Sequence, residues 1–376
     1  MADNPNNRKP RVLVLLFSPS WIAAARLPEV LVGAGFQVGS YCHAESFLAR
    51  SASNSYLVSM PEEGSAFPNL VAAVRSQKPE LLIPACELAV RFLHNIDAEQ
   101  KAGRLRAEVS DVVDLVRRSL GDPEGHRRGL SKIETHAVAR EAGLSVPRQE
   151  RVANLADARA FAAAVGYPVV IKAEYGCAGS AVHICGTAAE LDAAFQSLLS
   201  AEAGQRLLIE QFIEGTIASQ PSVSWAGEML EAITVVKERT HPGPTGPSSV
   251  LRPIVCPDAE QATRALVKQL GISGFSSAGF MIDGQGRAHL IEFNPRPVPG
   301  CTVSHLWGRS HARALWSQLV GVPHVREPVA EPLRPVALFP NEWLRDRSSP
   351  YLFQAYHDVP WRDPALVKAY LQAYIK

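Results

Sequence analysis

The sequence has no long hydrophobic run and almost no net charge. No stretch approaches the ~20 apolar residues that a membrane-spanning helix needs. Basic residues precede an apolar run over 12–17, but that run is too short for a signal peptide. A formal net charge of +1 gives no support to binding of nucleic acid or membranes by bulk electrostatics. These absences predict a cytoplasmic protein whose partners are small molecules, with no nucleic acid and no membrane among them.

Cysteine pairs and metal-type histidine spacings are also missing. No two cysteines form a CxxC motif, which argues against a zinc ribbon or a thioredoxin-like site. The histidines likewise show no metal-ligand spacing. We expect free thiols at all six cysteines: Cys42, Cys86, Cys177, Cys185, Cys256 and Cys301.

The first part of the chain alternates apolar strands with amphipathic helices. Such alternation predicts a doubly wound parallel sheet. The turn at 18–21, after the first strand, lacks the glycines that a close approach to pyrophosphate needs, which argues against a nicotinamide dehydrogenase. The predicted strands are 11–17, 35–41 and 81–84, and the predicted helices are 23–34 and 67–77.

The remainder of the 376 residues is long enough for further packed units. Polar, glycine-bearing sequence at 121–125 marks a boundary, and Ser131 is a candidate N-cap for the helix that follows it. We expect helices at 132–142, 156–165 and 258–270, an apolar strand running into a turn over 207–215, and strands at 168–172, 182–185, 229–236 and 280–282. The last of these strands forms a hairpin with a strand that ends at Glu292. The predicted units are 1–118, 119–205, 206–326 and a C-terminal extension, 327–376, to which we attach no chemistry.

The most informative segment is 290–296, an apolar strand ending in polar residues at alternate positions. Successive strand side chains point to opposite faces, so Glu292, Asn294 and Arg296 are expected to share one face. Carboxylate and amide oxygens suit Mg²⁺, and a guanidinium suits phosphoryl oxygens. The pattern predicts a metal-nucleotide site, although an ordinary edge strand with a polar face would look the same.

Three further elements precede this strand in a fixed order. They are a helix that begins with Lys132, a strand that ends in Lys172 before a small-residue loop at 174–180, and the segment 210–215. A loop with few large side chains can bring its N–H groups close to phosphates. The four elements in this order resemble the ATP-grasp superfamily over roughly residues 11 to 310.

The resemblance implies an N-terminal doubly wound domain followed by a two-lobed ATP-grasp domain, with ATP and Mg²⁺, or Mn²⁺, between the lobes. Lys132 and Lys172 match the lysines that contact the phosphates, and Arg296 matches the arginine that steadies the transferred phosphoryl group. Glu292 and Asn294 match metal ligands. The other implied nucleotide contacts are Gly176 and Gly179 in the loop, Glu210 at the adenine amine, and the adenine-edge segment Gln211, Phe212 and Ile213.

The sequence departs from the superfamily pattern in three places. The loop has only Gly176 and Gly179 where more glycines are usual. Ile217 stands where an acid usually meets the ribose. Gly279 stands where the first metal-binding acid is usual, and Asp283 lies too far along the turn to replace it.

The resemblance implies an ADP-forming ligase that activates a small carboxylic acid as an acyl phosphate and joins it to an amine. Arg239, Arg252 and Gly300 are candidates for the substrate side, although surface ion pairing would equally explain the two arginines. Two alternatives stay open: a carboxylase or carbamoyl-phosphate type of activity, and a nucleotide-binding protein without catalysis. Relatives of this kind are commonly dimers, which leaves a homodimer open.

Overall fold

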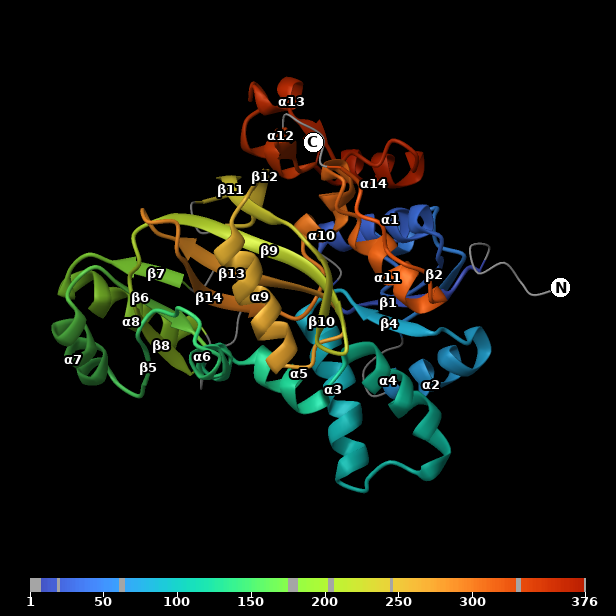
Figure 1. Cartoon of the computed structure of the whole chain (residues 1–376), viewed down its shortest axis with the longest axis horizontal. Helices are drawn as coiled ribbons and strands as arrows, with labels where there is room; N and C mark the ends of the chain where they lie inside the picture. The colour runs from blue at the N-terminus through green and yellow to red at the C-terminus, as the bar shows by residue number, and fades with distance from the viewer. Residues whose placement is uncertain are drawn as a thin grey trace.

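This computed structural model describes residues 8–18, 21–60, 65–174, 182–201, 206–243, 246–328 and 333–374. Within them the chain builds three sheets with helices packed around each (Figure 1). None of the helices in these ranges is long and apolar enough to cross a membrane.

The first sheet is parallel, with strand order β3-β2-β1-β4, as the alternation of strands and helices predicts. Its strands are β1 (Arg11–Leu16), β2 (Gln37–Cys42), β3 (Tyr56–Ser59) and β4 (Leu81–Pro84). Around it lie the α-helices α1 (Leu27–Ala34), α2 (Ala66–Gln77), α3 (Glu87–Lys101) and α4 (Ser110–Leu120), with the short 3-10 helices η2 (Ile22–Arg26), η3 (Leu48–Arg50) and η4 (Ala107–Val109). The short edge strand β3 is only half-buried, so its sequence lacks the apolar run that predicts the other three strands.

Two consecutive helices connect this unit to the next. They are α5 (Pro123–Leu130), which the sequence does not predict, and α6 (Lys132–Glu141). The Ser131 hydroxyl accepts a hydrogen bond from the Glu134 N–H and caps α6, as predicted. The cap fixes where α6 begins and therefore where Lys132 lies.

The second sheet is a small antiparallel one with order β5-β8-β6-β7. It contains β5 (Gln149–Val152), β6 (Val169–Ala173), β7 (Val182–Cys185) and β8 (Leu207–Gln211). The helices α7 (Leu155–Val165) and α8 (Ala188–Ala201) cover one face, where Ile171 and Ile209 pack against Phe161 and Phe195. The opposite face carries polar side chains, because residues one position away point the other way.

The third sheet is large, with path β14-β13-β9-β11-β12-β15-β16 and β10 paired with β9. Its strands are β9 (Thr216–Trp225), β10 (Glu228–Ala232), β11 (Thr234–Thr240), β12 (Ser248–Ile254), β13 (Gly274–Ile282), β14 (Ala288–Asn294), β15 (Val336–Ala337) and β16 (Tyr356–His357), and α9 (Pro257–Gln269) packs against it. The predicted hairpin of β13 and β14 is confirmed.

Two predictions about this third sheet are wrong. The single strand expected at 229–236 is two strands, β10 and β11, which pair with different stretches of β9: β10 lies opposite 222–225 and β11 opposite 218–219. The strand expected at 280–282 begins six residues earlier, at Gly274, because small polar residues such as Ser277 are buried between β9 and β14. A hydrophobicity pattern cannot identify a strand built from such residues.

The C-terminal part returns to the first sheet. The helices α10 (Pro299–Val303), η5 (Ser304–Trp307) and α11 (His311–Val320) follow β14, and α12 (Asn341–Arg345), α13 (Tyr351–Gln354) and α14 (Pro364–Tyr374) complete the chain. The Tyr370 hydroxyl donates to the Ile22 carbonyl, so α14 rests on the N-terminal unit (Figure 1). The last residues therefore connect the first sheet with the large one, which they extend through β15 and β16.

Candidate functional site

The polar face of the small sheet meets β14 of the large one. The Lys172 ammonium donates to the Ile291 carbonyl at 3.2 Å and forms an ion pair of 2.6 Å with Glu210. Gln149 Nε2 donates to the same carboxylate oxygen of Glu210 at 2.8 Å. All three side chains are at least nine-tenths buried. Lys172 and Glu210, which lie 38 positions apart in the sequence, are thus brought together at the junction of the two lobes.

Glu292 is the carboxylate at the centre of the site. Burial alone would raise its pKa, but four nearby cations outweigh that effect and hold the pKa below its usual value. These cations are Lys237, Lys132, Lys172 and Arg296. Three of them are predicted site residues, whereas Lys237, on β11, is not. The sequence gives no signal for Lys237, because only the pairing of β11 with β9, and of β9 with β13, brings it across the sheet.

The geometry of this site explains why residue 279 is a glycine. Gly279 lies directly opposite Glu292 in the β13–β14 ladder. A Cβ atom added at Gly279 would lie 2.6 Å from Cγ of Glu292 and 3.1 Å from one of its carboxylate oxygens. The space that a first metal-binding acid would occupy is therefore filled by the Glu292 side chain itself, and the glycine is what lets Glu292 fold over β13.

Arg296 lies outside the strand that was expected to carry it. β14 ends at Asn294, and the Arg296 N–H turns back to the Asn294 carbonyl at 2.9 Å. The prediction that Arg296 lies on the strand is therefore wrong, although its Nη2 still reaches the Asn294 side chain and donates to Oδ1 at 3.4 Å. Its guanidinium is buried between units: Nε and Nη2 both donate to one carboxylate oxygen of Glu87, Nε at 2.7 Å, and the group lies over the Trp21 ring at 4.9 Å.

Through Glu87 and Trp21, which both contact Arg296, the N-terminal unit borders the site. Glu87 begins α3 directly after β4, and Trp21 follows β1. In open parallel sheets, ligands bind outside the carboxyl ends of the strands. Neither residue carries a motif, so the sequence does not single them out, although their positions after two neighbouring parallel strands are a general signal.

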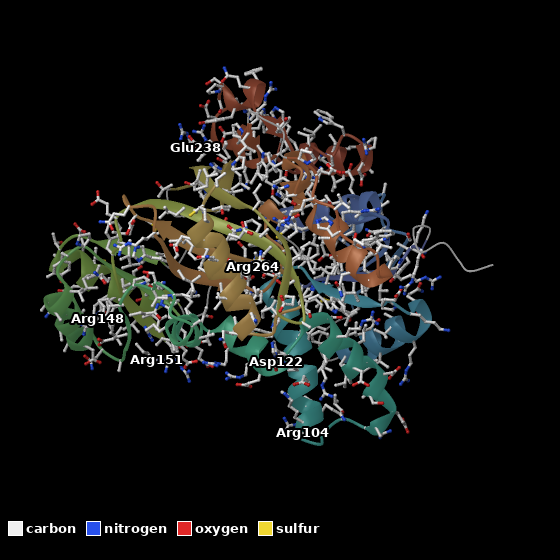
Figure 2. All side chains as sticks on the ribbon, in the orientation of Figure 1. Arg104, Asp122, Arg148, Arg151, Glu238 and Arg264 are labelled. Carbon is white, nitrogen blue, oxygen red and sulfur yellow. The ribbon has the colours of Figure 1, made fainter. Side chains whose placement is uncertain are left out.

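Lys132 is held beside Glu174, the last described residue before the loop that is predicted to bind phosphates. Its ammonium donates to the carbonyls of Ala173 and Glu174, at 3.3 and 3.1 Å. Glu174 is buried, accepts from the Ser131 hydroxyl and pairs with Arg151. Figure 2 shows Arg151 on the small lobe. The predicted contacts Gly176 and Gly179 lie outside the described residues.

The segment after β8 offers backbone groups to a ligand. Phe212 and Ile213 follow the end of β8 at Gln211, and the backbone of neither forms a hydrogen bond with any described residue. Gln211 continues the ladder opposite Val169 and its N–H donates to the Arg148 carbonyl. Ile217 lies on β9 opposite Met281 and brings no carboxylate there. Edge-on recognition of a base by backbone groups is compatible with this segment.

The structure gives Arg239, Arg252 and Gly300, the candidates for substrate binding, explanations other than contact with a substrate. Arg252 pairs with Glu238 at 2.7 Å, and Arg239 lies over the Tyr351 ring and contacts the same glutamate. Figure 2 labels Glu238 near the C-terminal segment. Both arginines are half-exposed, so surface ion pairing accounts for them. Gly300 is buried, and a Cβ there would meet Pro221 at 2.3 Å, so close packing explains the glycine.

The donor set for a metal is small. Among the described residues no group of three or more His, Cys, Asp or Glu side chains could hold an ion. Glu292 and Asn294 supply one carboxylate and one amide oxygen. Mg²⁺ is usually held by one or two carboxylates together with substrate phosphates and waters. These residues fit an ion that arrives with a nucleotide and do not form a metal centre by themselves.

Comparisons with known proteins agree with this architecture. Residues 131–219 match the family model "Carbamoyl-phosphate synthase L chain, ATP binding domain". The chain is 26% identical over 204 residues to the carbamoyl phosphate synthase large chain of Deinococcus radiodurans, covering 51% of this chain and 20% of that one. It is 30% identical over 214 residues to the phosphoribosylamine–glycine ligase of Pseudomonas syringae pv. tomato, covering 50% of each. The chain thus spans half or less of these relatives.

A solved structure of biotin carboxylase from Campylobacter jejuni, in complex with β,γ-ATP, superposes with a TM-score of 0.64. The sequence identity is 14%, and the match covers 86% of this chain and 73% of the other. At that identity the likeness concerns the fold, a parallel N-terminal sheet followed by two lobes. Sequence and fold therefore point to the same group of proteins, and the chain is similar to the ATP-grasp superfamily, as its motifs predict.

Proposed function

We propose that the protein is an ADP-forming ligase that uses ATP to activate a small carboxylic acid as an acyl phosphate and joins it to an amine. The observation that carries the proposal is the convergence of four cations on Glu292 at the junction of the two lobes. Phosphoryl transfer depends mainly on positioning and charge neutralisation, which such a set can supply. The ligases and carboxylases among the similar proteins support an enzyme of this class.

In this proposal the nucleotide lies between the small sheet and β14. Lys132, Lys172 and Lys237 neutralise phosphoryl oxygens as point charges, and the backbone after β8 meets the edge of the base. Lys172 is already held between Glu210 and the Ile291 carbonyl, so little side-chain freedom is lost when a phosphate arrives. Glu210, tied to Gln149 and Lys172, faces the amino group of the base.

Glu292 and Asn294 would hold Mg²⁺ together with the phosphates. The ion, when bound, would neutralise charge that develops on the phosphoryl group. With one carboxylate and one amide as protein ligands, metal affinity would depend on the nucleotide. Metal binding without nucleotide is therefore expected to be weak.

Arg296 would steady the transferred phosphoryl group and the acyl phosphate as a planar fork. Its present partner, Glu87, lies at the carboxyl end of the N-terminal sheet. That position supports binding of the acid and the amine between Arg296 and the ends of β1 and β4. The amine attacks the acyl carbon, the C–N bond forms, and phosphate leaves with the former acyl C–O bond electrons.

The test is ADP release by the full chain with MgATP and pools of amino acids, dipeptides and small carboxylic acids. Glu292→Gln and Lys172→Met remove site charges, and Glu228→Gln, an exposed glutamate on β10, is the matched control. ADP release that depends on one pool, is lost in both site variants and persists in the control would support the ligase.

Two other outcomes would overturn the proposal. Release that requires bicarbonate in place of any pool would indicate a carboxylase or carbamoyl-phosphate type of reaction. Nucleotide-dependent stabilisation of the fold without turnover in any pool, bicarbonate included, would indicate a nucleotide-binding protein without catalysis.

A further inference from the structure

A serine, a histidine and an aspartate form a hydrogen-bonded chain that uses none of the residues proposed for the nucleotide. The Ser145 hydroxyl lies 2.8 Å from Nδ1 of His289, and Nε2 of His289 lies 2.9 Å from Oδ2 of Asp283. The three residues come from the loop after α6, from β14 and from the β13–β14 turn. Only the tertiary structure brings Ser145 to the other two.

The direction of the hydrogen bonds follows from the chemistry of the groups. An ionised carboxylate only accepts, so Nε2 of His289 carries the proton that it donates to Asp283. In the neutral ring Nδ1 is then an acceptor, and the Ser145 hydroxyl donates to it. The hydrogen bond from His289, with further ones from the Arg287 and Gln285 backbone, holds the pKa of Asp283 well below its usual range. Asp283 therefore stays ionised and keeps this tautomer.

Asp283 is fixed by its own turn. Its Oδ1 accepts from the N–H groups of Gln285 and Arg287 at 2.9 and 3.0 Å, and Oδ2 accepts from the Arg287 guanidinium at 3.1 Å. The His289 side chain is only 11% exposed. The base and the group that orients it are thus held in place before any ligand binds, as an activated nucleophile requires.

Ser145, in contrast, is exposed to solvent and is also held. Its carbonyl accepts from the Leu290 N–H at 2.9 Å, which ties the loop to β14 beside His289. The N–H groups of Ser145 and Val146 form no hydrogen bond with any described residue. An N–H directly after a nucleophilic serine is a common donor to the oxyanion of acyl transfer. The loop thus presents a hydroxyl, a base and available N–H donors together.

We propose that Ser145 is a nucleophile for acyl transfer, with His289 as its general base and Asp283 as the residue that positions His289. The substrates are small activated acyl compounds such as carboxylic esters. Oγ of Ser145 bonds to the acyl carbon while its proton moves to Nδ1 of His289. The ester C–O bond breaks, and the leaving alkoxide takes that proton. Water then releases the acid by the same route and regenerates the serine.

The test is labelling of the full chain with an alkyl fluorophosphonate, followed by peptide mass mapping and by hydrolysis of p-nitrophenyl acetate. Ser348 is the matched control, because it is an exposed serine that donates to a carboxylate, Asp346, but has no histidine. General-base assistance contributes about 10²- to 10⁴-fold, so Ser145 is expected to react at least about 10²-fold faster than Ser348. Ser145→Ala should abolish both reactions and leave the melting temperature unchanged.

Asp283→Asn tests the positioning role through the pH profile. With an amide in place of the carboxylate, the histidine is no longer held in the tautomer whose Nδ1 accepts a proton. We expect the labelling rate to fall by about 10²-fold or more and to lose its dependence on pH, because Nδ1 of His289 no longer takes the proton of Ser145. A purely structural network would leave Ser145 no more reactive than Ser348. Equal labelling of the two serines, or ester hydrolysis that persists in Ser145→Ala, would overturn the proposal.

Discussion

The contact between Gly279 and Glu292 leads to a sharp prediction for Gly279→Ala. The added Cβ would lie 2.6 Å from Cγ of Glu292, whereas carbon atoms in contact prefer about 3.5–4.0 Å. Glu292 must therefore move by roughly 1 Å. Because the atom that clashes belongs to a side chain that can rotate, the fold should lose at most about 1–3 kcal/mol. A displacement of about 1 Å at a reacting centre can cost about 10²-fold in rate.

The assay compares ADP release under the substrate conditions found for the wild type with thermal unfolding in the presence and absence of MgATP. Gly284→Ala is the matched control, because it lies in the turn of the same hairpin and an added Cβ there meets no atom within 4 Å. We expect turnover to fall about 10²-fold in Gly279→Ala and to stay near wild type in Gly284→Ala. Full turnover in Gly279→Ala would refute the reasoning that Glu292 needs the space above β13.

Three further predictions concern charge. Glu87→Gln should reduce the free energy of unfolding by about 1–3 kcal/mol in chemical denaturation, because it leaves the buried Arg296 without a carboxylate. Lys237→Met should weaken MgATP binding, measured by calorimetry, because it removes one of the cations around the site carboxylate. Burial lowers the pKa of His94 to about 4 and that of His126 to about 3, so both side chains are neutral in the fold. Their contribution to the free energy of unfolding is complete above the unfolded pKa of about 6.5 and is lost as the pH falls from there through the two folded values. We therefore expect the melting temperature to decrease below pH 6.5.

A control variant or a contrary result tests each of the three charge predictions. Glu99→Gln removes an exposed partner of Arg104 and should leave stability unchanged, so an equal loss in both glutamate variants would contradict a special role for Glu87. Lys268→Met, on the exposed side of α9, should leave binding intact, and weakening in both lysine variants would point to bulk charge instead. A melting temperature that does not change between pH 7 and pH 5 would show that His94 and His126 are not held neutral in the fold.

Parts of the fold and site follow directly from sequence patterns. The first parallel sheet, the cap at Ser131 and the hairpin of β13 and β14 are predicted because each depends on residues close together in the chain. The missed elements are those whose identity depends on distant partners. β3 is a half-buried edge strand, and the early part of β13 contains small polar residues, Ser276 and Ser277, that are buried.

The sequence by itself predicted the similarity to the ATP-grasp superfamily and the order of the site residues, because these residues lie in or beside locally encoded elements. They are Lys132, Lys172, Glu210, Glu292 and Asn294. Only the tertiary structure decided how they are used. The turn after β14 sends Arg296 to Glu87, the paired strands bring Lys237 to Glu292, and Glu292 fills the space above Gly279. These outcomes depend on strand register and on packing between units, and both are set by contacts between residues far apart in the chain.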